Sequence, residues 1–580
     1  MIETLQRSGL ARTARLSVGD AIALTPNIAF VRTEGVTVPD YAELVLTAHP
    51  EKGVRMITRS DQPLLEHPSE IRLPLSMERR VSEASCFSKE EGAEVRGEEV
   101  RLEGEVAVLH RAFEMRRDAR TFVRKVSVLR EAIGPMSAIY APGIMDVSNL
   151  ALLCYCGIDI FDDSLLLYEA AKGKLSLPEG TLQADKAPWL LTDVSAEGCA
   201  ALNLRSAWNE LMMVRHMIGE GRLRELVEIR SNASPWSVSV LRLLDLERYE
   251  LQEKNAPVVG PRFYANSKQA LFRPDIRRWR KRVLERFQPA EHKKVLLLIP
   301  CSAKKPYFLS RSHQLFRSAI QSITNPEAVQ ELILTSPIGA VPRELELFYP
   351  AAQYDIPVTG HWDREEVAMV QELVAKVASL GFEKVICHLG DESEFVKQVV
   401  DCVDTTSGSP TSSESLRNLA MALEKATSAY ERVGRGQGRA RSMAAAARFQ
   451  FGPGGETLLD GCSVSGNYLY SKITENKVQL GLMTPERGMI SLTLEGAAKL
   501  MPQRLHQVQI GDFQITGNLF AVGVVEADEG IRIGDEVIIT RNGALEAVGI
   551  AGMSGPEMKR SKRGEAVRIR HKRRPGTDSV

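Results

Sequence analysis

The sequence contains no apolar run near the roughly eighteen residues that a membrane-spanning helix requires. It also shows no signal-peptide pattern at its start, Met1-Ile2-Glu3. Cysteine is scarce, with eight residues among 580, and most of these cysteines lie inside apolar runs, as is typical of a reducing compartment. These absences predict a cytoplasmic protein with no membrane contact.

A net charge is absent as well, because 74 lysines and arginines balance 74 aspartates and glutamates. A neutral total neither favours nor excludes a nucleic-acid partner, but the segment 559–574 is densely basic. The hydrophobic share of 44% and the charged share of 26% are ordinary for a globular protein. At 580 residues the chain is too long for one core, so about three or four domains are expected.

Residues 295–313 carry the densest chemistry in the sequence. The apolar run 295–299 predicts a buried strand that stops at Pro300. The side chains that follow it include a thiol, hydroxyls, cations and an imidazole: Cys301, Ser302, Lys304, Lys305, Tyr307, Ser310 and His313. Neighbouring cations and a helix N-terminus lower the pKa of a thiol, so Cys301 is a candidate nucleophile. The alternative is a buried strand-end cysteine followed by a solvated basic loop.

Two further apolar runs, 331–336 and 384–389, each end in a distinctive loop, and these loops cover 336–346 and 390–392. A helical pattern with acidic residues in its first turn, 363–380, lies between the two runs. The alternation of strands and helices predicts a doubly wound parallel sheet. Ligands bind outside the carboxyl ends of such strands, where all three loops fall, so a site is predicted there.

The motif P-C-S-x-x-K-P-Y-x-x-S-x-x-H, at 300–313, resembles the signature of the archaeosine synthase family, archaeal relatives of tRNA-guanine transglycosylases. The segments S-P-I-G-A-V-P-R-E-L-E at 336–346 and V-T-G-H-W-D at 358–363 also resemble the central domain of that family. The resemblance implies that lysine is added to the nitrile of 7-cyano-7-deazaguanine already installed in the tRNA D-loop. It also implies a radical SAM partner subunit that cleaves the adduct to archaeosine.

Within this hypothesis Cys301 forms a thioimidate that the lysine amine displaces, with Lys304 and Lys305 favouring the thiolate and His313 or Tyr307 shuttling protons. Direct attack by the amine, with Cys301 only structural, is equally compatible with the sequence. The predicted substrate-binding residues are Ser302, Lys305, Ser310, Arg343, Glu344, Glu346, Asp363 and Asp391. In this set the acids Glu344, Glu346 or Asp363 would hold the lysine ammonium, and Arg343 or Lys305 its carboxylate. Glutamine as the nitrogen donor and a homodimeric state stay open, and no cofactor is expected.

Residues 1–290 mix strand-like runs, such as 21–31 and 42–47, with helices, one of them near 208–228, which predicts an α/β barrel. The segment 142–163 resembles the transglycosylase barrel, and its G-x-D-x-F-D motif puts the nucleophilic aspartate of those enzymes at Asp162. The alternative for Asp162 is a loop or helix-cap carboxylate. The earlier catalytic aspartate and the zinc cluster of those enzymes have no counterpart here, because Cys199 and His216 alone cannot hold zinc. A degenerate site without a metal is therefore predicted.

The end of the chain, 504–574, resembles a PUA RNA-binding domain. Asn542-Gly543 is the strongest hairpin signal in the segment. The basic residues predicted to bind tRNA phosphates are Lys559, Arg560, Lys562, Arg563, Arg568 and Arg570. The basic, aromatic-rich segment 263–287 is a second and weaker candidate for RNA contact.

Together these patterns predict an α/β multidomain protein: a transglycosylase-like (β/α) barrel at 1–290, a central doubly wound α/β domain at 291–435, a small α+β domain at 436–503 and a β-barrel PUA domain at 504–580. The predicted function is tRNA modification by addition of an amine to the nitrile. Two alternatives are a true transglycosylase that exchanges bases through Asp162 and a non-catalytic tRNA-binding subunit.

Overall fold

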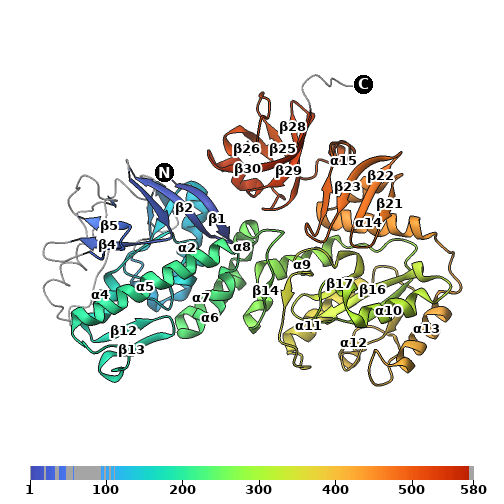
Figure 1. The fold of residues 1–580 in the computed structure, drawn as a ribbon, viewed down its shortest axis with the longest axis horizontal. Coiled ribbons are helices and arrows are strands. Elements are labelled where there is room, and N and C mark those ends of the chain that lie inside the picture. The colour runs from blue at the N-terminus through green and yellow to red at the C-terminus, as the bar shows by residue number, and fades with distance from the viewer. Residues whose placement is uncertain are drawn as a thin grey trace. The chain divides into compact units, whose positions relative to one another are not determined.

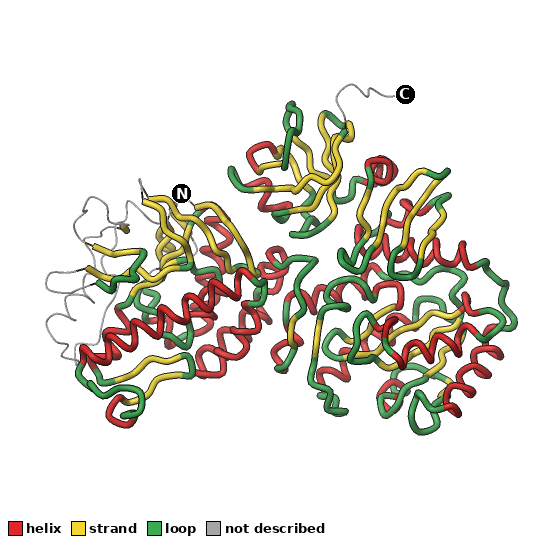
Figure 2. The backbone as a smooth tube through the Cα atoms, in the orientation of Figure 1, coloured by secondary structure: helices red, strands yellow, loops and turns green. Residues whose placement is uncertain are grey.

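The structure is a computed structural model that describes residues 2–18, 21–32, 38–47, 56–57, 93–96, 99–102, 106–109 and 111–573. The chain is mixed α/β and divides into two compact units, Met1–Ala256 with Arg560–Gly564, and Pro257–Lys559 with Glu565–Val580 (Figures 1 and 2). Within the described ranges, none of the helices combines the length and the apolar character needed to cross a membrane.

The first unit contains an eight-stranded sheet with the strand order β6-β5-β4-β11-β10-β9-β7-β8. Its neighbours are parallel except for the β7–β8 pair. Its strands are β4 (Asn27–Arg32), β5 (Leu44–Thr47), β6 (Met56–Ile57), β7 (Ala93–Arg96), β8 (Glu99–Leu102), β9 (Val106–Val108), β10 (Ala138–Tyr140) and β11 (Ile160–Asp162). An antiparallel sheet of β1 (Ile2–Ser8), β2 (Ala11–Val18) and β3 (Ala21–Thr25) precedes it. Among the described residues no pairing joins β6 to β8, so the closed barrel stays a prediction.

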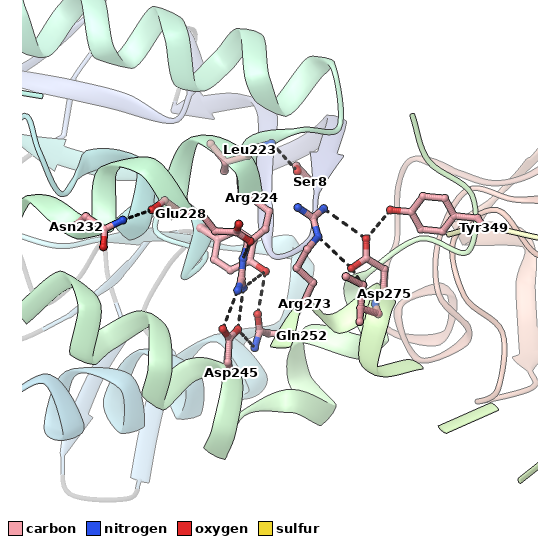
Figure 3. A network of polar contacts seen from close by, with 12 residues as sticks. Ser8, Leu223, Arg224, Glu228, Asn232, Asp245, Gln252, Arg273, Asp275 and Tyr349 are labelled. Atoms are coloured by element: carbon pink, nitrogen blue, oxygen red, sulfur yellow. Dashed lines mark hydrogen bonds and ion pairs between the residues drawn. The ribbon is translucent and has the colours of Figure 1, made fainter. Parts of the chain in front are cut away.

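Helices and one hairpin complete the first unit: α2 (Ala119–Ile133), α3 (Leu150–Tyr155), α4 (Ser164–Ala171), the hairpin β12 (Lys174–Leu177) and β13 (Gly180–Gln183), α5 (Ala196–Gly219), α6 (Leu223–Arg230), α7 (Pro235–Glu247) and α8 (Tyr249–Asn255). The single helix predicted near 208–228 is two helices, because Gly221 takes a φ of 69° between α5 and α6. A buried ion-pair cluster joins α6 to α7, since Arg224 donates to Asp245 at 2.8 and 2.7 Å and to Glu228 at 2.9 Å (Figure 3).

The second unit is built around a five-stranded sheet with the order β17-β16-β15-β19-β20. Its strands are β15 (Val295–Pro300), β16 (Val329–Thr335), β17 (Gly339–Pro342), β19 (Lys384–Cys387) and β20 (Val403–Asp404). Strand β15 pairs in parallel with β16 on one side and β19 on the other. The three predicted strands of this region are therefore confirmed. Every residue of β15 before Pro300 is fully buried, which explains its unbroken apolar sequence.

The helices that accompany this sheet are α9 (Pro274–Arg286), α10 (Arg311–Gln321), α11 (Arg364–Ala378), the one-turn α12 (Ser393–Val396) and α13 (Ser413–Thr427). The chain passes through α10 from β15 to β16 and returns through α11 to β19, on the other side of β15. Since such crossovers are right-handed, this reversal puts α10 and α11 on opposite faces of the sheet. Ser310 caps α10 by accepting from His313 N, and Asp363 and Glu366 form a capping box at α11.

Residues 257–290 belong to the second unit, whereas the sequence pattern predicts a first domain that extends to 290. The pair β14 (Phe263–Tyr264) and β18 (Tyr354–Asp355) and the hydrogen bond from Trp279 Nε1 to Ala340 O, 3.0 Å, tie this segment to the central sheet. The buried Arg273 is used internally, as Figure 3 shows: it donates to Asp275 at 3.3 and 3.4 Å while Tyr349 donates to the same carboxylate at 2.5 Å.

The small domain consists of α14 (Arg435–Phe451), α15 (Leu494–Leu500) and an antiparallel sheet of β21 (Ser463–Gly466), β22 (Ser471–Glu475), β23 (Val478–Met483) and β24 (Ile490–Leu492). Residues 434–438 form the start of α14, although their glycines resemble a flexible joint. A Cβ on Gly438 would lie 2.3 Å from Glu327 Oε2, so here glycine permits close packing.

The terminal sheet has the order β26-β30-β29-β28-β25-β27. Its strands are β25 (Gln507–Ile510), β26 (Leu519–Phe520), β27 (Val524–Ala527), β28 (Glu536–Arg541), β29 (Ala544–Ala551) and β30 (Glu565–Lys572), with α16 (Gly555–Arg560) before β30. The predicted hairpin turn is confirmed, because Asn542 and Gly543 have φ values of 50° and 78° between paired β28 and β29.

Candidate active site at the carboxyl end of the central sheet

Cys301 lies immediately after β15, at the edge where the parallel strands end. Its backbone N donates to Leu334 O of β16 at 3.1 Å, which holds the residue at the end of the ladder, and the side chain is partly exposed. The chain leaves β15 toward β16 on one side and later returns to β19 on the other, so the strand order reverses at β15. In doubly wound folds such a reversal point is where ligands bind.

A chain of buried hydroxyl groups lies beside Cys301. The Tyr354 hydroxyl makes short hydrogen bonds to the Tyr307 hydroxyl and to Thr335 Oγ1. Thr335 Oγ1 donates to Ser336 O at 2.9 Å, and Lys305 Nζ lies 3.9 Å from the centre of the Tyr354 ring. Hydroxyl groups both donate and accept, so the chain can pass a proton along its length.

Burial has the largest effect on the pKa values of Cys301 and Lys305. It raises the pKa of the Cys301 thiol, and the hydrogen bond from Thr335 and the charge of Lys305 oppose this shift without reversing it. Burial also lowers the pKa of Lys305, against the attraction of Cys301. The expectation that nearby lysines give Cys301 a low pKa is therefore wrong, because partial burial disfavours the thiolate more than Lys305 favours it. Lys304 is exposed.

His313 is held neutral beside a salt-bridge network. Arg343 donates to His313 Nδ1 at 2.7 Å and to Glu331 Oε2 and Glu346 Oε2 at 2.5 and 3.1 Å. A guanidinium never accepts, so the single ring proton of neutral His313 sits on Nε2. Burial and the Arg343 charge lower the pKa of His313 to about 3. The His313 ring also stacks on Tyr307, with ring centres 5.3 Å apart.

Some of the remaining residues predicted to bind substrate are paired inside the protein, and others bond within their own chain segment or are exposed. Glu346 is fully buried, accepts from Phe308 N at 2.9 Å and pairs with Arg343, and burial raises its pKa. Arg343 spends its donors on protein partners, which differs from the predicted carboxylate-binding role. Three others act on their own chain segment or are exposed: Ser302 Oγ donates to Lys304 O at 3.0 Å, Asp363 caps α11 and Asp391 is exposed.

Asp162 lies at the end of β11 in the first unit and is completely buried. Tyr140 Oη and Gly143 N donate to its Oδ2 at 2.6 and 3.0 Å, and Ser164 N donates to Oδ1 at 2.9 Å. Burial raises the pKa of Asp162 despite these donors. The carboxylate is thus enclosed on both oxygens, as in a structural role.

Cys199 and His216 both lie on α5, 17 residues apart, which corresponds to about 25 Å along a helix, so they cannot share a metal ion. Across the ranges that the structure describes, no group of three or more His, Cys, Asp or Glu side chains is placed to hold a metal.

The basic residues near the end of the chain have different surroundings. Arg570 donates to Leu492 O at 2.8 Å and makes a short contact with the buried carboxylate of Glu536. The surface pairs are Lys559 with Glu529 and Arg568 with Glu565, at 3.3 and 3.2 Å. Arg560, Lys562 and Arg563 fall in the short segment grouped with the first unit, where Lys562 and Arg563 are exposed. Arg574 lies outside the described residues.

Comparisons with known proteins place these observations in a family. Residues 276–423 match a family described as a domain of unknown function (DUF5591), and residues 513–573 match the PUA domain. Archaeosine synthase subunit alpha of Methanosarcina acetivorans is 36% identical over 530 residues, which cover 84% of this chain and 84% of that protein. The chain belongs to the archaeosine synthase family.

This family member also resembles more distant proteins. The tRNA-guanine(15) transglycosylase of Methanobrevibacter smithii is 24% identical over 461 residues, covering 72% of this chain and 64% of that protein. A crystal structure of a protein of unknown function aligns with 51% of this chain and all of the other, at 30% identity and a TM-score of 0.41.

Several residues of the site in this family member are not evident from the sequence. Thr335 and Tyr354 complete the hydroxyl chain, but a threonine at the end of β16 and a tyrosine in the two-residue strand β18 carry no local signal of that role. Glu331 faces Arg343 from the middle of β16, where it interrupts an apolar strand. That interruption is the one sign in the sequence that could have indicated its role.

Proposed function

We propose that this chain adds an amine to the nitrile of 7-cyano-7-deazaguanine in the tRNA D-loop, which gives an amidine on the way to archaeosine. Membership of the archaeosine synthase family supports tRNA modification. The observation that carries the chemistry is the position of Cys301, at the reversal point of the central sheet with Lys305 and the buried hydroxyl chain beside it. This arrangement favours an enzyme over a passive tRNA-binding subunit.

The proposed reaction needs no net oxidation or reduction. The Cys301 sulfur bonds to the nitrile carbon while the thiol proton moves to the nitrile nitrogen, which forms a thioimidate. A neutral amine then attacks the same carbon, the carbon–sulfur bond breaks, and the sulfur regains a proton. The product is an amidine and a regenerated thiol.

Burial disfavours both a thiolate and an ammonium here, so the proton has to move as the bonds change. Lys305 and the chain Tyr307–Tyr354–Thr335 offer routes for it. His313 is a positioning residue in this proposal, because it is already neutral and its Nδ1 is occupied by Arg343.

The other parts of the chain would bind tRNA. We assign residues 1–256 as a degenerate transglycosylase barrel, 257–435 as the catalytic domain, 436–503 as a supporting α+β domain, and 504–580 as the PUA domain. The name of the Methanosarcina relative, subunit alpha, supports a second subunit, for which a radical SAM enzyme is the proposed partner. The enclosed carboxylate of Asp162 speaks against base exchange as the activity.

Nucleoside mass spectrometry tests the proposal directly. Transfer RNA carrying 7-cyano-7-deazaguanine is incubated with the full chain and free lysine, and in parallel with glutamine. The expected result is a nucleoside heavier by one lysine, with no added cofactor. Unchanged nitrile with both donors, despite tRNA binding, would overturn the assignment.

A further inference from the structure

A cavity of about 230 Å³ lies in the second unit between the central sheet domain and the small domain. Gln330 and Glu344 line it from the first of these domains, Arg317 lines it from α10, and Arg439 and Tyr468 line it from the small domain. Cys301 and Lys305 do not line it. This volume is below the roughly 300 Å³ at which pockets for drug-sized ligands begin, so it suits a ligand smaller than a nucleoside.

Two buried acceptors of this cavity lack partners. Gln330 is 1% exposed, and its Oε1 receives no hydrogen bond, while its Nε2 donates to Glu344 Oε2 at 2.7 Å. Glu344 Oε1 also receives none, and burial raises the pKa of this carboxyl group. Buried acceptors are normally satisfied, and leaving them unpaired is costly. The charge of Lys293 acts on Glu344, but its Nζ donates to Val329 O at 2.7 Å. An ammonium group supplies three donors, which is what this pair of acceptors lacks.

Cationic groups stand on another part of the wall. The Arg317 guanidinium lies 4.3 Å from the Phe308 ring centre and is otherwise exposed. Arg439 uses its Nη2 on the backbone oxygens of Gly466 and Asn467, at 2.8 and 3.3 Å. These two guanidiniums leave N–H groups for a carboxylate. Arg343 is less suited to this role, because four of its five N–H groups already donate to Glu331, Glu346 and His313.

The wall therefore carries side chains of both charges. A simple anion would meet Glu344, Glu331 and Glu327, and a simple cation would meet the arginines and Lys293. A molecule with an ammonium at one end and a carboxylate at the other satisfies both groups.

We propose that this cavity binds a free amino acid that carries a side-chain ammonium, with its carboxylate at Arg317 and Arg439 and an ammonium at Glu344 and Gln330. The inference rests on the proposed function and deepens it by locating the amine donor. The motif 300–313 connects the cavity to the Cys301 site. Phe308 and His313 line the cavity, and Tyr307, immediately before Phe308, belongs to the hydroxyl chain beside Cys301. Phe308 also stacks on Tyr468 of the small domain, with ring centres 4.4 Å apart.

Isothermal titration of the full chain, alone and saturated with tRNA that lacks the nitrile base, tests the site without turnover. Lysine is expected to bind. Cadaverine, which lacks the carboxylate, and glutamine, which lacks the side-chain ammonium, are each expected to bind at least about tenfold more weakly. No lysine binding in either state, or equal binding of glutamine, would overturn the proposal.

Variants separate the cavity from other sites. Glu344→Gln and Arg317→Met are each expected to weaken lysine binding about tenfold or more. The matched controls Glu372→Gln and Lys472→Met remove exposed charges outside the cavity and should leave it unchanged. Since Arg317 is exposed, its variant remains informative if Glu344→Gln folds poorly. Lysine binding that neither variant weakens would overturn the site.

The nitrile assay distinguishes failure of the proposed function from failure of the proposed lysine site. Lysine binding at the cavity without any adduct on tRNA would remove the proposed function and keep the site. Adduct formation with the same lysine KM in Glu344→Gln and Arg317→Met as in the wild-type chain would remove the site and keep the function.

Discussion

At the scale of single residues, Cys301 is the residue on which the proposed chemistry depends. Its thiol is protonated at rest, because burial raises its pKa above the usual value. A nucleophile of this kind reacts only when a substrate or a neighbouring base takes its proton. Lys305 can act as that base, because its charge acts on Cys301 and burial lowers its pKa, which favours the neutral amine.

Replacing Cys301 with serine is expected to lower the single-turnover rate of lysine addition by roughly three orders of magnitude or more, because serine is a far weaker nucleophile without an adjacent base. The tRNA affinity should stay unchanged, since Cys301 is not expected to contact a phosphate. Rapid-quench assays with saturating tRNA give the rate, and Cys462→Ser, at another partly exposed cysteine, is the control. A rate near that of the wild-type chain would eliminate the thioimidate and leave direct attack by the amine.

His313 provides a prediction about pH. Its pKa is lowered from 6.5 to about 3 in the folded chain by burial and by Arg343. Between pH 6.5 and 3 the unfolded chain therefore binds a proton at His313 that the folded chain does not bind. As the pH drops through this range, the free energy of unfolding falls by about 1.4 kcal/mol per pH unit because of this group. Above pH 6.5 the contribution is constant.

His313→Gln keeps an acceptor for Arg343 and removes the titration. The thermal midpoint of the variant should fall less steeply than that of the wild-type chain between pH 6.5 and 4, and the two curves should run parallel from pH 7 to 8. Since His292, with a pKa near 4, titrates in the same window, the difference between the two proteins is the quantity to read. Identical slopes would mean that His313 is not held neutral.

Residue types and spacing mark Cys301, Tyr307 and His313 as candidates, because they cluster in one short motif. The structure stacks His313 on Tyr307, and the catalytic roles of all three stay predictions. Residue types and spacing do not suffice for the pKa of Cys301, since burial at the sheet edge outweighs charges that look favourable in the sequence. Nor do they find Tyr354 or Gln330, whose roles depend on contacts with residues distant in the chain.

At the scale of elements, the apolar runs predict β15, β16 and β19 to within about two residues at each end, because fully buried strands are uniformly apolar. The predictions fail where packing overrides composition. The glycines at 434–438 look like a joint but lie at the start of α14, and Arg273 and Arg278 of the segment 263–287 look like RNA-binding residues but have partners inside the second unit. RNA contact by the rest of that segment stays a prediction. Polar partners of buried arginines cannot be read from a linear pattern.

Arg570 on β30 illustrates the same point and gives a prediction. It meets Glu536 of β28, whose carboxylate is fully buried and also accepts from Leu492 N at 2.9 Å. Arg570→Met removes the closer of the two guanidinium groups beside that carboxylate and leaves Arg487, 4.0 Å from Glu536 Oε2, so unfolding should become easier by about 3 kcal/mol, the lower end for a broken buried pair. Thermal unfolding measures this, and Arg568→Met, which breaks an exposed pair, should cost only about 0–1 kcal/mol.

The double variant Arg570→Met/Glu536→Gln should recover part of the stability, because it also removes the buried charge. Equal stability of Arg570→Met and the wild-type chain, together with weaker tRNA binding, would instead return Arg570 to the RNA-binding set.

At the scale of the whole molecule, the sequence pattern predicts one basic cluster that binds tRNA, but the structure divides that cluster by role. Arg570 is internal, Lys559 and Arg568 are paired on the surface, and Lys562 and Arg563 are exposed in the turn between α16 and β30. Neutral net charge means that no general attraction to tRNA adds to such local contacts. The electrostatic part of binding should therefore depend on few side chains.

The double variant Lys562→Ser/Arg563→Ser is expected to weaken tRNA binding and to flatten its dependence on salt. Each phosphate that is no longer neutralised lowers the slope of log affinity against log salt by about 0.7–0.9, so the slope should fall by about 1.5 if both residues bind phosphates. Filter binding across a range of salt concentrations measures the slope. Arg417→Ser/Lys425→Ser removes two exposed charges of the same sign from α13 and is the matched control. If the control flattens the slope as much as the test variant does, the turn before β30 has no special part in binding, and tRNA must be held elsewhere on the chain.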